Sequence, residues 1–338
     1  MAETMRAWQL ARPGPLDETL SLSNTVPKPS ANDLKAGQIL IRTLSAGLNP
    51  VDYKLPGSGT LAKLILPFPK TPGLDVAGEV VAVGTGAEAS VGDHVLGRCD
   101  PKRAGGALAE FTVLDADGFA VIPKDVDSDE AGGAGTAALT ELQAIAPYVK
   151  PGDKIFINGG SGGTGTYGVQ IAKLLGCHVT TTCSAEKAPL VKELGADVII
   201  DYKTEDVEAR LKQEGQVFKL ALDNNGNNWT QRYQNCHNYL TPDGAFVLVG
   251  ADVSGPEIAA MAMASILPGF LGGGKRKFVP FLAKNNKTDL NQLAEWMSQK
   301  KLKTIIEKSF EFEEVAEAYA HLKKGSSKGK VVVRVAKQ

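Results

Sequence analysis

The sequence contains few cysteines, no excess of either charge and no long hydrophobic run, and each absence narrows its possible functions. The four cysteines include no Cys-x-x-Cys pair, so no zinc knuckle or dithiol redox motif is visible. Scattered thiols are typical of a reducing compartment, and we interpret Cys177 and Cys183 as buried apolar residues.

Charge and hydropathy give no support for nucleic acid or a membrane as a partner. The formal net charge is −1 over 338 residues, so the overall charge does not predict nucleic acid or an anionic membrane as a partner. No apolar run is long enough to span a membrane, and the N-terminal residues lack the features of a signal peptide. We therefore expect a cytoplasmic protein. Its length predicts two domains rather than one core.

Hydrophobic patterns divide the chain. Up to about Pro123, short strand patterns broken by Gly and Pro predict an irregular all-β unit. From Lys154 onwards strands alternate with helices, which predicts a parallel sheet covered by helices. A last strand at 330–335 needs a sheet to join, and the N-terminal β unit is its expected host. The strands predicted in the alternating part are Lys154–Asn158, His178–Cys183, Val198–Asp201, 217–223 and 245–249.

A glycine-rich stretch, 159–165, directly follows the strand predicted at Lys154–Asn158, and three of its glycines have the G-x-G-x-x-G spacing. Glycines leave backbone N–H groups accessible to a diphosphate, and the next helix start adds unpaired N–H groups and the positive end of its dipole. Because the motif lies between a strand and a helix, it predicts a dinucleotide site rather than a plain glycine turn. The expected contact residues are Gly160, Ser161, Gly162, Gly163, Thr164 and Gly165.

The residues after the second strand favour NADPH over NADH. An NAD site has a carboxylate here that accepts hydrogen bonds from the ribose, whereas this chain has Ser184, with Lys187 three residues later. A hydroxyl and an ammonium would hold a 2′-phosphate that a carboxylate would repel, and Tyr202 after the next strand offers a phenolic donor. Ser184 is also suited to cap the following helix, and the acidic Glu186 counts against a phosphate.

Six short motifs follow one another along the chain. They are Leu48-Asn49-Pro50-Val51-Asp52, Pro72-Gly73-Leu74-Asp75-Val76-Ala77-Gly78, Val91-Gly92-Asp93-His94-Val95, the glycine loop, Leu194-Gly195-Ala196-Asp197 and Gly329-Lys330-Val331-Val332. Together they resemble the zinc-independent quinone oxidoreductase and enoyl reductase-like branch of the medium-chain dehydrogenase/reductase superfamily, over nearly the whole length. The resemblance implies an α/β fold, with a Rossmann doubly wound parallel sheet and a GroES-like β-rich catalytic domain completed by the C-terminal segment. The expected domains are 1–126 (GroES-like), 127–265 (Rossmann, NADPH-binding) and 266–338 (return segment).

The same resemblance argues against a metal. The zinc alcohol dehydrogenases of the superfamily have a ligand cysteine where this chain has Asn49, and His-Glu where it has Leu74 and Asp75. A leucine cannot bind zinc, and catalytic zinc needs three protein ligands at one point. The structural zinc lobe is also missing, since only Cys99 lies in that region. Without a Lewis acid, hydride transfer suits an acceptor that is already activated by conjugation.

The resemblance also implies roles for residues outside the glycine loop. It places Asn49 and Thr140 near the nicotinamide or its ribose. Val249 and Gly250 end the last predicted Rossmann strand and are expected to lie beside the nicotinamide. Lys330, in the last motif, is a further expected cofactor contact.

Two residues are candidates for the chemistry itself. Lys54 completes an Asn-Pro-x-Asp-x-Lys pattern similar to that of fungal trans-acting enoyl reductases, in which the lysine contacts the cofactor. It is expected to bind ribose or stabilise an enolate, the alternative being an exposed lysine without a role. Tyr53 is the nearest candidate general acid, with a packed tyrosine and protonation by solvent as alternatives.

The sequence thus predicts an NADPH-dependent, zinc-independent reductase that transfers a hydride to an enone, enal, enoyl thioester or quinone. One alternative is a trans-acting enoyl reductase of a polyketide or fatty-acid synthase, and another is a non-catalytic NADPH-binding protein. The basic run 275–277 is either a solvated face or a surface for phosphopantetheine or an acidic carrier protein. The sequence leaves the small-molecule substrate and the oligomeric state open, although relatives are often homodimers paired through the edge of the Rossmann sheet.

Overall fold

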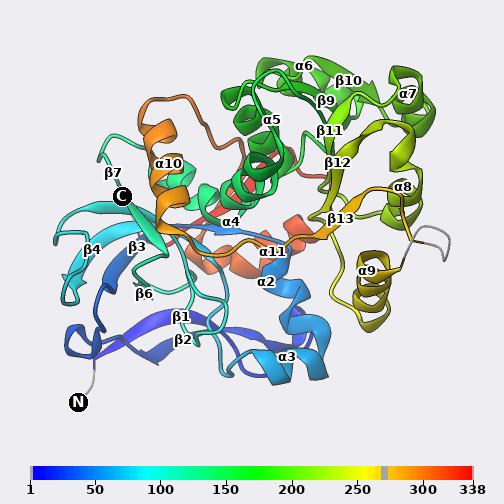
Figure 1. Cartoon of the computed structure of the whole chain (residues 1–338). Helices are drawn as coiled ribbons and strands as arrows, with labels where there is room; N and C mark the ends of the chain where they lie inside the picture. Colours follow the sequence, from blue (N-terminus) through cyan, green and yellow to red (C-terminus); the bar gives the residue numbers. More distant parts are fainter. Residues whose placement is uncertain (1–2, 268–272, 337–338) are drawn as a thin grey trace. The chain divides into compact units, whose positions relative to one another are not determined.

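The computed structural model describes residues 3–267 and 273–336 (Figure 1). The chain folds into two compact units: a β-rich unit, formed by Met1–Leu139 and Lys284–Gln338, and a Rossmann unit, formed by Thr140–Ala283. Both boundaries lie later in the sequence than the predicted 126/127 and 265/266. Helix α4 (Ser128–Ile145) is one continuous helix whose first half packs in the β-rich unit, and strand β13 (Lys277–Pro280) still belongs to the Rossmann sheet.

The β-rich unit contains a β1–β2 hairpin and a seven-stranded sheet in the order β14-β15-β3-β4-β5-β7, with β6 also paired to β3. The C-terminal strand β15 runs antiparallel to β3, with Val331 opposite Leu48, which confirms the predicted return of the chain to this sheet. The strands are β1 (Thr4–Leu10), β2 (Leu20–Pro27), β3 (Ile39–Leu48), β4 (Asp75–Val83), β5 (His94–Arg98), β6 (Phe111–Leu114), β7 (Phe119–Ile122), β14 (Ile306–Glu311) and β15 (Lys330–Arg334). The helices are α1 (Leu16–Thr19), α2 (Val51–Lys54), α3 (Thr60–Ile65), α10 (Lys287–Ser298) and α11 (Val315–Lys323), besides the start of α4.

Helix α4 approaches strand β3 closely because both elements carry glycine at the contact. A β-carbon on Gly47 would lie 2.5 Å from the carbonyl oxygen of Gly132, and a β-carbon on Gly132 would lie 3.0 Å from the carbonyl oxygen of Ser45. Side chains at these positions would push the helix away from the strand. The glycines at the start of α4 therefore allow the helix to lie directly against the end of β3, the strand that leads into Asn49.

The Rossmann unit contains a six-stranded sheet in the order β10-β9-β8-β11-β12-β13, in which all neighbouring strands are parallel. Counted from the first strand of the unit, the order is 3-2-1-4-5-6, that of a dinucleotide-binding Rossmann fold. The strands besides β13 are β8 (Lys154–Asn158), β9 (His178–Cys183), β10 (Val198–Asp201), β11 (Phe218–Asp223) and β12 (Leu240–Leu248). The helices besides the end of α4 are α5 (Gly165–Leu174), α6 (Ala188–Glu193), α7 (Val207–Glu214), α8 (Trp229–Asn235) and α9 (Gly255–Ile266).

Alternate residues of each strand pack against different helices. On β8, Ile155 and Ile157 join a core cluster that includes Val169 of α5, whereas Phe156 joins a cluster that includes Tyr233 of α8. This period of two places one helical layer on each face of the sheet. Cys177 and Cys183 lie in the same buried cluster as Ile155, which confirms the prediction that both are buried. The other two cysteines, Cys99 and Cys236, are also buried and free.

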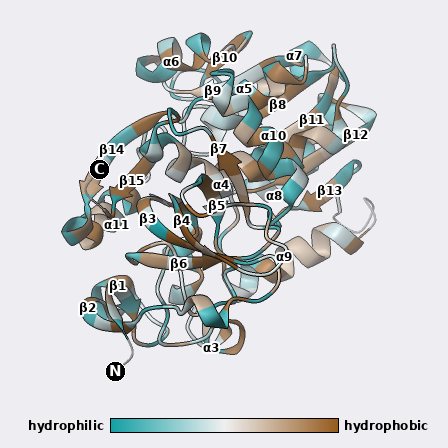
Figure 2. Cartoon of the chain, turned by 90° about the vertical axis from the view of Figure 1, so that its left-hand side faces the viewer, coloured by the Kyte–Doolittle hydropathy of each residue, from teal (hydrophilic) through white to brown (hydrophobic). Residues whose placement is uncertain are grey.

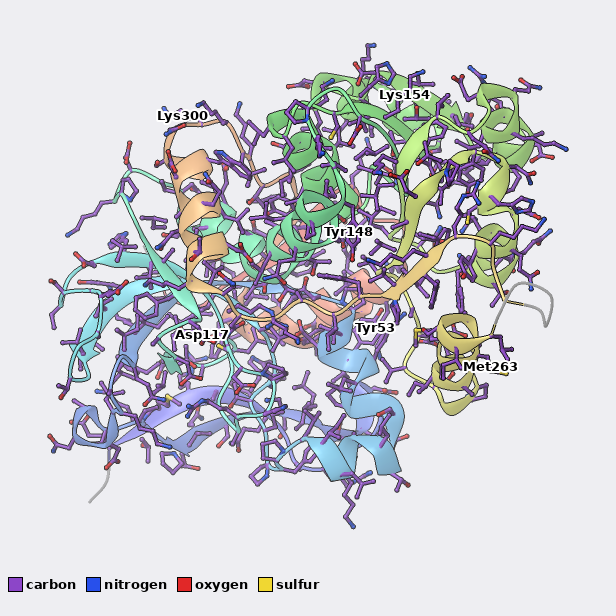
Figure 3. All side chains as sticks on the ribbon, in the orientation of Figure 1. Tyr53, Asp117, Tyr148, Lys154, Met263 and Lys300 are labelled. Atoms are coloured by element: carbon purple, nitrogen blue, oxygen red, sulfur yellow. The ribbon has the colours of Figure 1, made fainter. Side chains whose placement is uncertain are left out.

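Helix α9 is an exception among the covering helices. It is pale to brown in the hydropathy colours of Figure 2, yet none of its residues is fully buried. Met261 packs against the core, whereas Ile258, Ile266 and Met263, which is labelled in Figure 3, are exposed. Within the described residues, no helix is long and apolar enough to cross a membrane.

Candidate active site

The glycine loop leaves β8 at the carboxyl edge of the Rossmann sheet, where it was predicted. Two of its glycines are required by the protein itself: a β-carbon on Gly160 would lie 2.1 Å from Oγ1 of Thr181, and one on Gly165 would lie 2.1 Å from the carbonyl oxygen of Gly159. Gly162 differs, because the nearest atom to its β-carbon would be 3.6 Å away. The fold therefore has no steric need for glycine at 162. A closely bound diphosphate would require glycine at this position.

Hydrogen bonds fix this loop to the neighbouring strands. The amide of Asn158 donates to Asp223 Oδ1 (2.8 Å) and accepts from the Thr182 hydroxyl (2.8 Å), which in turn accepts from the backbone N–H of Gly159 (2.8 Å). Asp223 Oδ2 pairs with Arg232 at 2.6 Å. The buried network joins β8, β9 and β11, so the loop is held before any ligand binds.

The residues proposed for the adenosine end gather at the ends of β9 and β10. Asp201 lies opposite Cys183 in parallel register, so the residues that follow, Tyr202 and Ser184, start side by side about 5 Å apart. Ser184 is buried, and its hydroxyl bonds to Glu186 Oε1 at 3.3 Å instead of capping a backbone N–H.

The other residues at this end differ in exposure and partners. Lys187 is half-buried and Tyr202 is 55% exposed. Sequence reasoning missed Asp201, a carboxylate at the same edge, whose Oδ1 accepts a hydrogen bond from the backbone N–H of Lys203 at 3.0 Å. That bond occupies part of the capacity of the Asp201 carboxylate to accept hydrogen bonds from a ribose.

The loops after β11 and β12 meet at the same carboxyl edge. The backbone N–H groups of Val249 and Gly250 donate to the carbonyl oxygen of Asp223 at 2.9 and 3.0 Å. A β-carbon on Gly226 would lie 2.0 Å from the carbonyl oxygen of Gly250, so the two loops pack without side chains between them. Asn224, in the first of these loops, lies at the point where the strand order reverses, the usual ligand position in such sheets.

Thr140 is buried on α4, and the next residue, Glu141, is a functional candidate that the sequence analysis missed. The Glu141 carboxyl is fully buried, and within the described residues no hydrogen bond of normal geometry satisfies either oxygen, although the amide of Asn224 faces it. Burial raises the pKa of Glu141 to about 8, and the facing amide of Asn224 offsets only part of that shift. The only sequence signal was a charged residue in the second half of a helix whose other charged residues lie in its first turn.

In the β-rich unit, Asn49 lies in a buried polar cluster with Lys330 and Asp75. Asn49 Oδ1 accepts a hydrogen bond from the Lys330 ammonium at 2.6 Å, and Asn49 Nδ2 donates to Asp75 Oδ2 at 2.8 Å. Lys330 also donates to Asp75 Oδ2 at 3.3 Å and to the carbonyl oxygen of Leu48 at 3.1 Å. The structure thus brings together Asn49 and Lys330, which lie 281 residues apart in sequence.

The short helix α2 carries the two candidate chemical residues. Tyr53 and Lys54 are both half-buried, and the Tyr53 ring (Figure 3) meets Tyr319 of α11 edge to face, with ring centroids 6.5 Å apart. Asp52, between Val51 and Tyr53, is fully buried and accepts a hydrogen bond from the backbone N–H of Asn49 at 2.8 Å. Burial raises the pKa of Asp52 to about 7. The edge-to-face contact with Tyr319 is a packing role, and it accounts for the position of the Tyr53 ring.

The donor set at this point does not fit a catalytic zinc. Asn49 and Leu74 replace two ligands, and the Lys330 ammonium lies 2.6 Å from Asn49 Oδ1, where it would repel a cation. Among the described residues, no three His, Cys, Asp or Glu side chains cluster in a way that could hold a metal ion. We therefore derive no step through a metal.

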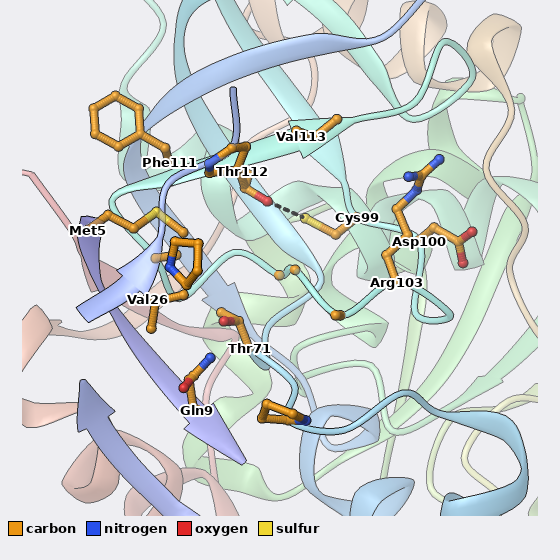
Figure 4. A pocket seen from close by; sticks show the side chains of 17 residues that line it. Met5, Gln9, Val26, Thr71, Cys99, Asp100, Arg103, Phe111, Thr112 and Val113 are labelled. Carbon is orange, nitrogen blue, oxygen red and sulfur yellow. Dashed lines mark hydrogen bonds between the residues drawn. The ribbon is translucent and has the colours of Figure 1, made fainter. Parts of the chain in front are cut away.

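A separate cavity of about 450 Å³ lies in the β-rich unit between β1, β2 and the 99–106 loop (Figure 4). Cys99 lines it, with Sγ 3.9 Å from Oγ1 of Thr112, and burial raises the pKa of this thiol to about 12. Such a thiol is not a nucleophile near neutral pH. No predicted site residue lines the cavity, so it contributes nothing to the assignment of the site.

The basic run 275–277 is engaged within the Rossmann unit. Arg276 donates to the carbonyl oxygen of Leu240 at 3.1 Å, and the Lys277 ammonium lies 5.0 Å from the ring centroid of Tyr148. Lys275 lies 3.5 Å from the His237 imidazole. These contacts favour a structural role for Arg276 over a docking surface.

Comparison with known proteins decides the family. Residues 35–124 match the family described as "Alcohol dehydrogenase GroES-like domain", and residues 194–333 the family described as "Zinc-binding dehydrogenase". The chain is 39% identical to the protein named "Trans-enoyl reductase pgmF" from Aspergillus terreus, over 98% of this chain and 96% of that one. The chain belongs to the medium-chain dehydrogenase/reductase superfamily.

Two further relatives support the predicted branch of this superfamily. The "Quinone-oxidoreductase homolog, chloroplastic" of Spinacia oleracea is 31% identical over 89% of this chain and 91% of its own length. The structure of the quinone oxidoreductase from Coxiella burnetii aligns with a TM-score of 0.83 at 29% identity, covering 99% of this chain and all of that one. These medium-chain reductases confirm the predicted fold and the predicted quinone oxidoreductase and enoyl reductase-like branch, and the chain is an oxidoreductase of that family.

Proposed function

We propose that the protein is an NADPH-dependent reductase of conjugated acceptors: enones, enals, enoyl thioesters or quinones. The family supports a reductase with a nicotinamide cofactor. The preference for NADPH is supported by the residues that follow β9. The buried hydroxyl of Ser184 and the nearby ammonium of Lys187 occupy the place where an NAD site has a carboxylate. When bound, the cofactor supplies a hydride to the β-carbon of an enone, and the α-carbon takes a proton.

The residues present fit such a cofactor. The glycine loop leaves room at Gly162 for a diphosphate, and the start of α5 adds backbone N–H donors. We propose that the loop residues 160–165 bind the diphosphate, and that Ser184, Lys187 and Tyr202 bind the 2′-phosphate. Asn49, Lys54, Thr140, Val249, Gly250 and Lys330 keep the proposed roles that the family resemblance gives them at the nicotinamide end.

Steady-state oxidation of NADPH and of NADH tests this function. The acceptor panel contains 2-alkenals, 1,4-quinones and crotonyl thioesters, each assayed with and without a chelator. We expect NADPH turnover with at least one acceptor class and no effect of the chelator. Tight NADPH binding without turnover would instead identify a non-catalytic NADPH-binding protein. Chelator-sensitive turnover would contradict the zinc-independent assignment.

The 39% identity to a protein named a trans-enoyl reductase favours a second candidate function. In that case the enoyl group arrives on the phosphopantetheine arm of a carrier protein of a polyketide or fatty-acid synthase. Carrier-bound crotonyl thioester should then be reduced with a higher kcat/KM than the same acyl group on N-acetylcysteamine. Equal values would favour a free small-molecule substrate.

A homodimer is a further proposal about this protein. Within the described residues, β13 ends the order of strands and pairs with β12 alone, so its outer edge offers backbone groups to a second copy. Light scattering measures the mass directly. A mass equal to that of one chain across the micromolar range would contradict the proposal.

A further inference from the structure

The side-chain amide of Asn49 has almost no hydrogen-bonding capacity left for a ligand. An asparagine amide offers two N–H donors and an oxygen with two lone pairs. Asn49 Nδ2 donates to Asp75 Oδ2 at 2.8 Å and pairs at 3.5 Å with the carbonyl oxygen of Gly47. Asn49 Oδ1 accepts from Lys330 at 2.6 Å. What remains is one lone pair on Oδ1.

Lys330 and Asp75 fix the orientation of this amide. An ammonium has no lone pair and an ionised carboxylate has no proton, so an amide turned by 180° would place N–H against Lys330 and oxygen against Asp75. The Lys330 ammonium has three donors, and it has three acceptors inside the β-rich unit: Asn49 Oδ1, Asp75 Oδ2 and the carbonyl oxygen of Leu48. Asp75 is held in turn by the backbone N–H of Thr136.

These groups are also shielded from water. Asn49 is 6% exposed and Lys330 is 3% exposed, while Asp75 is fully buried. In these surroundings a reversed amide would place its N–H against the Lys330 ammonium and its oxygen against the Asp75 carboxylate. The electrostatic cost of these two contacts is larger in a buried site than it would be in water. The small exposed part of Asn49 is therefore presented to a bound molecule in one orientation only.

We infer that Asn49 acts toward a bound molecule only as a hydrogen-bond acceptor, and that Lys330 and Asp75 are positioning residues that hold its amide in this state. The ligand group it recognises is an O–H or N–H donor. On a nicotinamide nucleotide, the candidates are a hydroxyl of the nicotinamide ribose and the carboxamide N–H. The same geometry prevents Asn49 from donating to a substrate carbonyl or an enolate oxygen, so that stabilisation comes from another group.

This inference rests on the proposed cofactor, and it also changes the expected role of Lys330. The sequence predicts Lys330 as a direct cofactor contact, which stays a prediction, but its three donors already have acceptors within the described residues. Lys330 then acts through Asn49. The structure makes the same assignment for Asp75, which the sequence analysis considered only as a departure from the zinc pattern.

The test measures the affinity of wild-type protein and Asn49→Ala for three ligands. These are NADP⁺, its 3-acetylpyridine analogue, which has a methyl group in place of the carboxamide nitrogen, and an analogue lacking one hydroxyl of the nicotinamide ribose. We expect Asn49→Ala to weaken NADP⁺ binding about 3- to 10-fold, the usual range for one hydrogen bond. The effect should fall below about 2-fold with the analogue that lacks the recognised donor. The two analogues thus distinguish carboxamide from ribose.

Equal losses with all three ligands would overturn the inference, because a merely structural role does not depend on one ligand donor. Failure of the wild-type protein to bind NADP⁺ would instead count against the proposed function. The exposed Asn32→Ala serves as the matched control and should change none of the affinities.

Asp75→Asn tests the positioning role without removing volume. An amide at 75 can donate as well as accept, so it no longer forces the Asn49 amide into one orientation. We expect a loss of NADP⁺ affinity similar to that of Asn49→Ala, and no further loss when both changes are combined. Additive losses would overturn the positioning role. Thermal unfolding of each variant shows whether it is folded, and the double variant is compared with Asn49→Ala alone at matched folded fraction.

Discussion

The carboxyl group of Glu141 lies against the backbone of Gly168, so closely that a β-carbon at position 168 would be 2.3 Å from Glu141 Oε2. A glycine on α5 and a glutamate on α4 therefore fit one another within the Rossmann unit. The contact buries an ionisable group among neutral neighbours, since the facing side chain is the amide of Asn224. The folded protein must therefore either keep Glu141 protonated or bury the negative charge of its carboxylate.

This relationship predicts how stability depends on pH. The folded-state pKa of Glu141 is raised to about 8, from an ordinary value of 4.5. Between these values the folded protein keeps a proton that the unfolded chain releases, so the free energy of unfolding falls as pH rises and levels off above about 8. Glu141→Gln keeps the shape without the ionisation. Its stability relative to wild type should therefore increase across this range, by on the order of 2–4 kcal/mol. Urea unfolding at a series of pH values measures the difference. A constant difference from pH 5 to 9 would contradict the shifted pKa.

Lys187→Asp tests the proposed phosphate site. Replacing the ammonium by a carboxylate removes an attraction for the 2′-phosphate and adds a repulsion. We expect NADPH affinity to fall about 10- to 100-fold, given 1.5–3 kcal/mol for a hydrogen bond to a charged group. NADH affinity should change less than about 3-fold, since that cofactor lacks the phosphate. Lys192→Asp, at an exposed position of α6, makes the same change in net charge and is the control. Similar losses of NADPH and NADH affinity would argue against the phosphate assignment.

Tyr53→Phe tests whether the phenol is the general acid. Phenylalanine keeps the edge-to-face contact with Tyr319 and removes only the hydroxyl. Because aromatic packing accounts for the ring, we expect kcat to fall less than about 5-fold, with protonation by solvent, whereas a positioned acid contributes about 100-fold or more. Tyr53→Ala is the contrasting variant and should lower the unfolding temperature by removing the ring. A loss in kcat above about 100-fold, at unchanged NADPH affinity, would identify Tyr53 as the acid.

The sequence was sufficient to predict those parts of the fold in which a single strand or loop has a recognisable pattern of neighbouring residues. The strands Lys154–Asn158, His178–Cys183 and Val198–Asp201 were predicted with the bounds that the structure shows, because turn residues delimit each short apolar run. The boundaries between the units were not predictable in this way. Helix α4 has one continuous helical pattern, and its division between the units depends on glycines that meet β3, which is a long-range contact.

The candidate site shows the same division between local and long-range information. The glycine loop is contiguous, so its chemistry could be read from neighbouring residues. Asn49, Asp75 and Lys330 come from three separated segments and meet only because β15 returns to pair with β3 beside β4. Glu141 gave no motif at all, since what distinguishes it is its burial in three dimensions without a charged partner or a hydrogen bond of normal geometry.

Two glycines of the same loop predict opposite outcomes on substitution by alanine. At Gly162 the added β-carbon meets no protein atom closer than 3.6 Å, so Gly162→Ala should unfold within about 2 °C of wild type. It should nevertheless weaken NADPH binding by about 10-fold or more, because the methyl group occupies the space that the diphosphate needs. At Gly165 the β-carbon would lie 2.1 Å from the carbonyl oxygen of Gly159, so Gly165→Ala should lower the unfolding temperature by several degrees even without cofactor. Thermal unfolding and titration with NADPH measure both effects. If Gly162→Ala bound NADPH as tightly as wild type, the diphosphate would not pass this part of the loop, and the proposed cofactor site would lose its main structural support.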